Sequence, residues 1–318
     1  MNPNILGALL LCVSPLSMAQ AQSPDWLDRS NATREAMSRM DRLINSNDSK
    51  TAYDHYMAMF HPTVKAWGLR ENQAADLKHI KQHYLPVFFE LEGGVLVSDQ
   101  IVVAGPMAAQ RYHSMMLLNG SFDGVEAKNK PIVIRGQTFF HIDENGLIAE
   151  RWSNHDHSYR MGQLLGEEGR KQGVSIAQAL NGPGITETQG IETMQAFVAA
   201  FNQPEAPTRR KNETARFLSP TLQAHGMGTR FIDESQSVDF LAELWNAYPD
   251  LLLSIGPAIS GWSFVAVDWR LTGSQRRGFR SVFRPDSPVC FQGQAILHFT
   301  TDRKIDEIWI DVKEQCLE

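Results

Sequence analysis

Two histidine–glutamate pairs occur at the same spacing in the two halves of this 318-residue chain. His141 precedes Glu150, and His298 precedes Glu307 in the same way, 157 residues further along. A carboxylate beside an imidazole fixes its tautomer and favours its charged form, which suits general acid–base catalysis. A polar pair across two strands can also be purely structural, and that role is the commoner one. His141 and Glu150 are therefore catalytic candidates, with the structural role left open.

Each pair lies in a segment that occurs twice without a gap, first as Gly136–Trp152 and then as Gly293–Trp309. Gly, Gln, His, Ile, Glu and Trp stand at the same offsets in both copies, which indicates an internal duplication. Asn145 and Gly146 in the first copy form a strong signal for a two-residue β-hairpin turn. Each copy is thus predicted to be a pair of antiparallel strands.

The position of the turn fixes which residues face each other and which side chains share a surface. His141 is predicted opposite Glu150, and Arg135 opposite Asp156. The same surface carries large apolar side chains and polar ones, as the wall of a binding pocket does. The substrate-binding candidates on this surface are Gln137, Trp152 and Asn154 in the first copy, and Gln294, His298, Glu307, Trp309 and Asp311 in the second.

Four residues outside the duplicated hairpins complete the substrate-binding candidates. Trp67 and His225 occupy the same position in two stretches, 61–68 and 219–226, that align with each other. Trp67 would offer an apolar ring face to a ligand. Arg111 and His113 alternate onto one side of a predicted strand, where either could hold an anionic or carbonyl oxygen. A buried structural role is an equally common use of such an arginine.

We expect neither a metal ion nor a cofactor. The sequence lacks the glycine-rich, P-loop, zinc-protease and nucleophile-elbow motifs. His155, Asp156 and His157 are adjacent and could ligate a metal, but strand alternation points them to opposite faces and a third ligand on one face is not evident. A small-molecule ligand is the expected partner.

Composition and charge argue against a nucleic-acid partner. The chain has 42% hydrophobic and 21% charged residues, as globular proteins do, and a net charge of -6. Residues 5–17 are apolar but too short to cross a bilayer, and Ala19-Gln20-Ala21 matches a signal-peptide cleavage site. We therefore interpret residues 1–21 as a signal peptide, although it has no Lys or Arg before its apolar run. The protein is expected to be periplasmic or secreted, without a membrane span.

Two cysteines, Cys290 and Cys316, follow the predicted signal peptide. In an oxidising compartment they could join the ends of two paired strands by a disulfide. The predicted hairpin register is one residue out for such a bond, which would need a bulge or a frayed end. A disulfide and two buried thiols remain equally compatible with the sequence.

The order of predicted elements is the same in both halves. Apolar residues first recur at helical spacing and then in strand-like runs, an order typical of α+β folds and not of βαβ folds. A Gly-rich stretch separates the halves. We predict two tandem cone-shaped α+β domains, each with three N-terminal helices packed on a strongly curved antiparallel sheet, at residues 30–168 and 189–318, with a linker at 169–188.

Several short motifs resemble those of the SnoaL-like polyketide cyclases, which have the nuclear-transport-factor-2-like cone fold. The motifs are GLIAERWSNHD at Gly146–Asp156, GQLLG at Gly162–Gly166, LQAHG at Leu222–Gly226, AYPDLLLSI at Ala247–Ile255 and DWRLTG at Asp268–Gly273. The resemblance covers nearly all of the chain after the signal peptide, once per half. It implies a substrate cavity inside each cone, and packing of the two sheets as a pseudo-dimer, with a homo-oligomer as a further option.

In these cyclases an Asp a few residues after a Trp acts as general acid and base in an aldol-type ring closure. The resemblance gives this role to Asp156, four residues after Trp152. A strand-end salt bridge with Arg135 is the alternative for Asp156. The second half has Lys313 at the matching position, with Asp311 as the nearest acid. The first domain is therefore the better candidate for catalysis.

The sequence leaves two hypotheses of different classes. In the first, the protein binds a small, largely apolar carbonyl-containing or aromatic molecule in a cone cavity and is a cofactor-independent cyclase or isomerase that uses Asp156. In the second, it is a non-catalytic periplasmic protein with a binding or structural role. Both are consistent with this fold, because a fold does not by itself determine a function.

Overall fold

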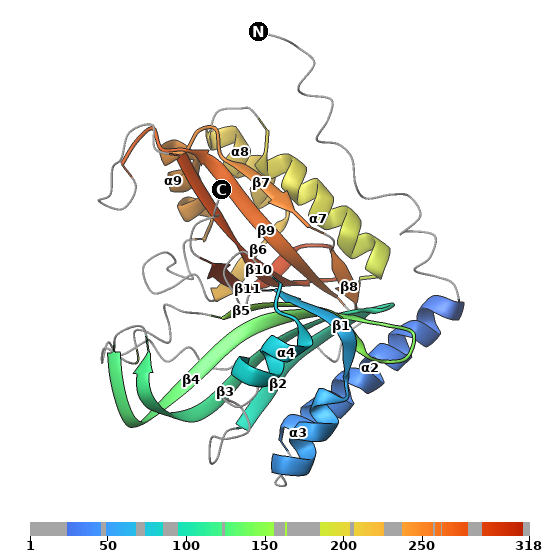
Figure 1. The fold of residues 1–318 in the computed structure, drawn as a ribbon. Helices are drawn as coiled ribbons and strands as arrows, with labels where there is room; N and C mark the ends of the chain where they lie inside the picture. Colours follow the sequence, from blue (N-terminus) through green and yellow to red (C-terminus); the bar gives the residue numbers. More distant parts are fainter. Residues whose placement is uncertain are drawn as a thin grey trace, which may run out of the picture.

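A computed structural model describes residues 24–45, 49–67, 74–84, 95–122, 125–155, 163, 185–203, 207–225, 237–256, 258–261, 263–278 and 288–313. The protein is α+β, with one mixed β-sheet in each half of the chain (Figure 1). The N-terminal half here means the described residues up to 155, and the C-terminal half those from 185 onward.

The N-terminal half has a sheet in the order β1-β5-β4-β3-β2, with helices that precede and interrupt its strands. Strands β1 and β5 pair in parallel, so the expectation of a purely antiparallel sheet is wrong for the first strand. The elements are α2 (Pro24–Ile44), α3 (Ser49–Met57), β1 (Phe60–Trp67), α4 (Leu77–His79), a π-helical turn η2 (Ile80–Tyr84), β2 (Val95–Ala104), β3 (Met107–Phe122), β4 (Val125–Ile142) and β5 (Ile148–His155).

The C-terminal half repeats this order of strands as β6-β11-β10-β9-β7, with β8 paired to β9, and β6 again joins its neighbour in parallel. Its first helix starts at a capping box, in which Thr186 and Gln189 each accept a hydrogen bond from the other's backbone N–H. The elements are α7 (Glu187–Phe201), α8 (Pro207–Ala215), β6 (Leu218–His225), α9 (Ser237–Ala247), β7 (Leu252–Ile255), β8 (Ile259–Gly261), β9 (Phe264–Ser274), β10 (Pro288–Phe299) and β11 (Ile305–Lys313).

The predicted hairpin registers are confirmed. His141 lies opposite Glu150 in the first hairpin, and His298 lies opposite Glu307 in the second. The first turn differs in detail from the prediction: the N–H of Gly146 donates to the carbonyl of Asp143, and Gly146 has φ of 74°. This is a turn followed by a left-handed glycine and a bulge, which restores the predicted pairing beyond it.

The pairing of strands outside the hairpins also corresponds between the two sheets, at the same offset of 157 residues. Gln110 pairs with Thr138 on β3 and β4, and Val267 pairs with Ala295 on β9 and β10, each 157 residues further along. A residue in one sheet can therefore be compared directly with its counterpart in the other.

Three apolar clusters hold the described structure together. In each half the helices pack on one face of the sheet: Met37, Met40 and Phe140 belong to the N-terminal cluster, and Phe197 and Trp245 to the C-terminal one. The third cluster lies between the two sheets and contains residues of both, including Phe139, Ile296 and Trp309. Each sheet is consequently buried on both faces, and the two sheets lie between the helices of the two halves (Figure 1).

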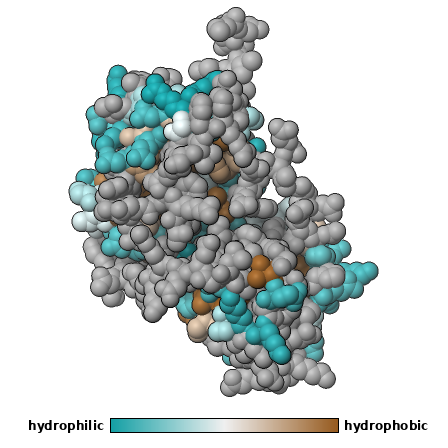
Figure 2. All heavy atoms as spheres, turned by 90° about the vertical axis from the view of Figure 1, so that its left-hand side faces the viewer, coloured by the Kyte–Doolittle hydropathy of each residue, from teal (hydrophilic) through white to brown (hydrophobic). Residues whose placement is uncertain are grey.

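The outer surface of the described residues is mostly polar. In Figure 2 the coloured residues of one face are mostly hydrophilic, with small hydrophobic patches between them. Large apolar side chains such as Leu27, Met115 and Leu252 are exposed at separate places, which is ordinary for a folded protein. None of the helices described is both long and apolar enough to cross a membrane.

Candidate functional site

The residues predicted to line a cone cavity lie on the sheet faces that contact each other, not on the faces under the helices. This corrects the expected position of the pocket wall. Strand alternation groups these side chains correctly, but both faces of each sheet are buried, so alternation cannot tell which face the helices cover. The candidates placed on these faces are Arg111, His113, Gln137, His141, Glu150, Trp152 and Asn154 in the N-terminal sheet, and Gln294, His298, Glu307, Trp309 and Asp311 in the C-terminal sheet.

Amide side chains connect the two sheets in a nearly reciprocal way. Gln137 Nε2 donates to the carbonyl of Trp309 at 3.0 Å, and its counterpart Gln294 Nε2 donates to the carbonyl of Trp152 at 3.2 Å. Asn154 Nδ2 adds a bond to the carbonyl of Asp311 at 3.1 Å. Such reciprocal contacts are typical of a two-fold interface. These three polar candidates thus have an evident structural role.

The histidine–glutamate pairs are backbone partners, and in the C-terminal half their side chains contact other residues. His298 Nδ1 lies 2.5 Å from Asp306 Oδ1, while Glu307 Oε1 lies 2.9 Å from His225 Nε2. The parallel strand β6 brings His225 beside Glu307 and stacks its ring on Trp309 at 5.7 Å. In the described part of the N-terminal half, no hydrogen bond or ion pair joins His141 to Glu150.

Arg111 and His113 share one carboxylate. Arg111 Nη1 lies 3.6 Å from Asp99 Oδ2, and His113 Nδ1 lies 2.7 Å from Asp99 Oδ1. The Asp99 side chain is only 4% exposed. The guanidinium of Arg111 also lies over the ring of Trp309, 4.8 Å from its centroid. Burial lowers the pKa of Arg111, and the nearby carboxylates of Asp99, Asp311 and Glu307 oppose this effect.

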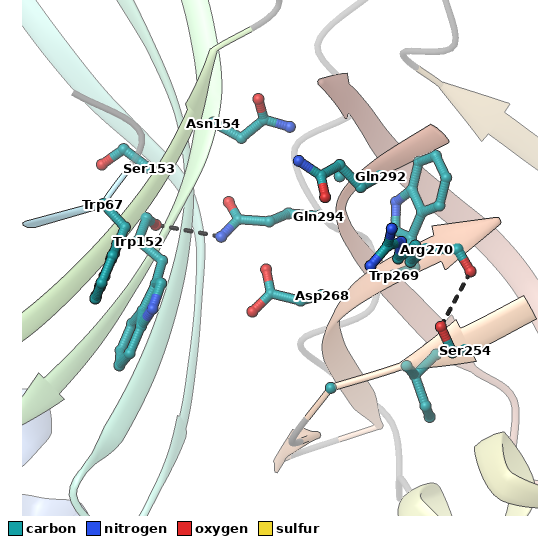
Figure 3. A pocket seen from close by; sticks show the side chains of 13 residues that line it. Trp67, Trp152, Ser153, Asn154, Ser254, Asp268, Trp269, Arg270, Gln292 and Gln294 are labelled. Carbon is teal, nitrogen blue, oxygen red and sulfur yellow. Dashed lines mark hydrogen bonds between the residues drawn. The ribbon is translucent and has the colours of Figure 1, made fainter. Parts of the chain in front are cut away.

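A cleft of about 350 Å³ opens between the two sheets at the other end of their contact (Figure 3). Trp67 and Trp152 form its wall on the N-terminal half, and Asp268 points into it from β9. Gln294 and Asn154 also line it, so the structure brings four of the predicted substrate-binding residues together here. Burial raises the pKa of Asp268, while a hydrogen bond to Gln294 acts against this rise.

Asp268 is the functional candidate that the sequence did not single out. Asp268 belongs to the DWRLTG motif, where it stands in place of the arginine that Arg111 provides in the first half, but an acid on a strand is unremarkable until its surroundings are known. A usable signal was present in the register: Asp268 lies opposite Gln294 on the same face as the predicted pocket residues. Raised carboxyl pKa values in a cleft are a common mark of functional sites.

A second cavity, of about 140 Å³, lies between the helices and the sheet of the C-terminal half and shares Ile255 and Trp269 with the lining of the cleft. Only apolar side chains line it, among them Phe197, Leu244, Val267, Trp269 and Ala295. None of the described residues that line it is titratable. This cavity matches the expected place of a ligand in the cone, although none of the predicted site residues forms its wall.

The corresponding face of the N-terminal sheet is apolar around Phe140 but carries polar side chains beside it. Asp41 on α2 accepts hydrogen bonds from Ser98 Oγ at 2.8 Å and Gln110 Nε2 at 3.0 Å. Burial raises the pKa of Asp41, and these two hydrogen bonds oppose the rise. Thr138 and Ser153 are hydrogen-bonded on the same face. Asp156, the predicted acid and base, lies outside the described residues.

Cys290 is disulfide-bonded, which favours the predicted disulfide over a free thiol at this position. The predicted partner, Cys316, lies outside the described residues. Arg270 Nε donates a hydrogen bond to Cys290 Sγ at 3.1 Å.

Comparison with known proteins finds similar folds among solved structures. No family model and no curated protein matches the sequence. A putative hydroxylase, AclR, from Streptomyces galilaeus is 19% identical, with a TM-score of 0.35, and the match covers 40% of this chain and 90% of that one. A putative SnoaL-like polyketide cyclase from Jannaschia sp. CCS1 is 18% identical, with a TM-score of 0.34, over 42% of this chain and 91% of that one. An NTF2-like protein of unknown function from Exiguobacterium sp. 255-15 is 14% identical, with a TM-score of 0.31, over 38% and 98%.

Each of these matches covers less than half of this chain. Among solved structures the chain is thus similar to SnoaL-like polyketide cyclases and NTF2-like proteins.

Proposed function

We propose that the protein binds a small, largely apolar molecule in the cavity of the C-terminal cone. The observation that carries this proposal is a cavity of about 140 Å³ whose described wall is entirely apolar. An engineered apolar cavity of about 150 Å³ stays dry and binds benzene, so a cavity of this size suits a single ring or a short aliphatic group. Release of the apolar ligand surface from water supplies the affinity.

Binding is favoured over catalysis in this particular cavity. Proton transfer requires an acid or base within hydrogen-bond distance of the substrate atom. The described wall offers carbon atoms and the indole of Trp269, and no carboxylate or imidazole. A bound carbonyl compound would be held there by its apolar part.

The test is a titration of the whole protein with indole and toluene, followed by calorimetry. Ala295 is 5% exposed and lines the cavity, so Ala295→Leu fills the space a ligand needs. We expect this variant to lose detectable binding. Ala196→Leu makes the same chemical change at an exposed position of α7 and serves as the control. Unchanged affinity in a folded Ala295→Leu protein would exclude the cone cavity as the binding site.

Cofactor-independent acid–base catalysis by the N-terminal half is the second candidate. The observation that favours it is the contrast between corresponding positions under the helices: Gln110 and Thr138 in the N-terminal sheet stand where Val267 and Ala295 stand in the C-terminal one. A polar region with a buried acid, Asp41, is the kind of environment in which a carboxyl can exchange protons.

In this second candidate Asp156 acts as acid and base, with His141 and Glu150 in support, as the family resemblance implies. A panel of enolisable ketones and aldehydes, monitored by exchange of the α-proton with deuterium, tests it. Loss of exchange in both Asp156→Asn and Asp41→Asn would support catalysis in this half. Exchange that persists in Asp156→Asn and His141→Ala would reject the proposed residues.

We also propose export to the periplasm or the medium after removal of residues 1–21. The apolar run and the Ala19-Gln20-Ala21 pattern support this. N-terminal sequencing of protein recovered outside the cytoplasm should start at Gln22. A start at Met1 would contradict it.

A further inference from the structure

We propose that the cleft between the two sheets binds an organic cation, such as an amidinium or guanidinium group, between Asp268 and the indole of Trp152. This site is distinct from the apolar cone cavity. It follows from a comparison of the two ends of the contact between the sheets: at one end Arg111 lies over the ring of Trp309, and at the other no described cation lies over the ring of Trp152.

Arg111 and Asp268 are corresponding residues. Arg111 pairs with Gln137 on β3 and β4, and Asp268 pairs with Gln294 on β9 and β10, each 157 residues further along. At the same offset, Gly256 stands where the N-terminal half has Asp99. Where the N-terminal sheet has the guanidinium of Arg111, the C-terminal sheet therefore has the carboxylate of Asp268. Where the N-terminal half has Asp99, the ion-pair partner of Arg111, the C-terminal half has a glycine without a side chain.

In the N-terminal half these residues occupy the space between the sheets. Arg111 reaches across to the ring of Trp309, 4.8 Å from its centroid, and is paired with Asp99 at 3.6 Å. Trp152 corresponds to Trp309 in the duplicated hairpin. In front of Trp152 the shorter Asp268 and the bare Gly256 leave the cleft of about 350 Å³. The cleft thus corresponds to the volume that the Arg111 side chain occupies at the other end of the contact between the sheets.

The groups that face the cleft are suited to a ligand that donates hydrogen bonds. The Asp268 carboxylate is directed toward the cleft, and no ion pair to it occurs among the described residues (Figure 3). Gln294 Oε1 is buried and has no hydrogen-bond partner in the described structure. The indoles of Trp67 and Trp152 offer ring faces to a cation, which is the interaction that Arg111 makes with Trp309.

Arg270 is the other charged residue among those described that line the cleft. It is exposed, and its Nε donates to Cys290 Sγ, so water screens its repulsion of a bound cation. The strands β1, β5, β7 and β10 contribute only uncharged residues to the described lining. Cation binding requires ionised Asp268, whose pKa burial raises, so affinity should increase as the pH rises through that pKa and then level off.

Calorimetric titration of the whole protein with benzamidine and benzamide tests the inference. The two probes have nearly the same shape, but only benzamidine is a cation at neutral pH. We expect benzamidine to bind and benzamide to bind about tenfold more weakly or not at all, because a charge-assisted hydrogen bond is worth about 1.4 kcal/mol or more, a factor of ten. Equal affinity for the two at neutral pH, or tighter binding of benzamide there, would overturn the proposal and indicate a protonated Asp268 that donates to a carbonyl.

Asp268→Asn should reduce benzamidine affinity about tenfold or more. Glu243→Gln removes the same charge from an exposed position on α9 and should leave affinity unchanged. Ala295→Leu, which fills the cone cavity, should also leave benzamidine binding intact, so the two sites can be told apart. Equal losses of benzamidine affinity in the Asp268 and Glu243 variants would show that the effect arises from net charge alone and would reject the site.

The double variant Gly256→Asp with Asp268→Arg builds the pair of Asp99 and Arg111 into the C-terminal half. A covalent arginine then occupies the proposed position of the ligand, and benzamidine binding should disappear. If the folded double variant binds benzamidine as the natural protein does, the cleft is not the site. Should the double variant fail to fold, Asp268→Asn alone decides the question.

Discussion

The guanidinium of Arg111 lies 4.8 Å from the ring centroid of Trp309, so one half of the chain places a cation on an aromatic ring of the other half. Trp309 is 4% exposed and the Arg111 side chain 19%, so water does little to weaken this contact. The same guanidinium neutralises buried Asp99. The sequence left two roles open for Arg111, a ligand for a substrate oxygen and a buried structural arginine, and these contacts favour the structural role.

Arg111→Met should therefore lower the free energy of unfolding by about 2–4 kcal/mol, since it removes the cation–π contact and leaves Asp99 paired with His113 among the described residues. Urea denaturation followed by tryptophan fluorescence measures this. Arg270→Met, at an exposed position, should change stability by less than about 0.5 kcal/mol. A similar loss in both variants would mean that the position of Arg111 between the sheets contributes nothing.

Gly261→Ala should also weaken the junction between the halves. A Cβ at Gly261 would lie 2.8 Å from the carbonyl oxygen of Val103 in the opposite half, a clash with backbone that cannot move aside. We expect a loss of about 1–3 kcal/mol in the free energy of unfolding. Gly256→Ala is the control, because its Cβ would make an ordinary 3.4 Å contact with Asp268, and it should cost less than about 0.5 kcal/mol. Equal effects of the two would show that the close approach of β8 to β2 is not maintained in solution.

Local pattern was enough to predict the two hairpins and the α+β class. The register of His141 with Glu150 and of His298 with Glu307 follows from turn position and strand alternation, which are local properties of the chain. The parallel pairing of β1 with β5 was not predictable in this way, because it joins strands far apart in sequence. The same is true of His225, which reaches Glu307 only through the parallel strand β6.

The sequence predicts which side chains share a face but not what covers that face. Gln137, Asn154 and Gln294 are polar in a largely apolar pattern, which predicts a pocket wall, and Asn154 and Gln294 line the cleft between the sheets. In the structure their amides satisfy backbone carbonyls of the opposite sheet. Burial at a sheet–sheet contact and burial in a ligand cavity select the same residue types, so the sequence alone could not distinguish them. The role of Asp268 required the comparison with Arg111 in three dimensions.

The disulfide of Cys290 gives a prediction about its partner. The chain contains three cysteines, and Cys12 lies in the predicted signal peptide, which leaves Cys316 in the mature protein. Mass-spectrometric peptide mapping of exported protein without reduction should find Cys290 linked to Cys316. Cys290→Ser should lower the free energy of unfolding by about 2–4 kcal/mol. A link to Cys12 would contradict both this pairing and the removal of residues 1–21.

Asp268 should make the stability of the protein depend on pH in the direction opposite to most carboxylates. Its pKa in the folded protein is raised by burial above the ordinary 3.8, so the folded state holds the proton more tightly than the unfolded state. The stability that this group contributes is present below pH 3.8 and is lost as the pH rises through the pKa that Asp268 has in the folded protein. Asp268→Asn should therefore raise the melting temperature at pH 7, and the gain should vanish at acid pH.

Asp302 supplies the control for this prediction. It is fully exposed, and a hydrogen bond from Thr300 lowers its pKa. Its contribution to stability is therefore present above pH 3.8 and is lost as the pH falls through the pKa of the folded protein. Asp302→Asn should give no gain in melting temperature at pH 7. Calorimetric scans of both variants between pH 3 and 8, with and without benzamidine, compare them directly. If Asp268→Asn lowers the melting temperature at pH 7 without benzamidine, the negative charge of Asp268 is already stabilised in the folded protein. That result would contradict a cation-binding role for the cleft.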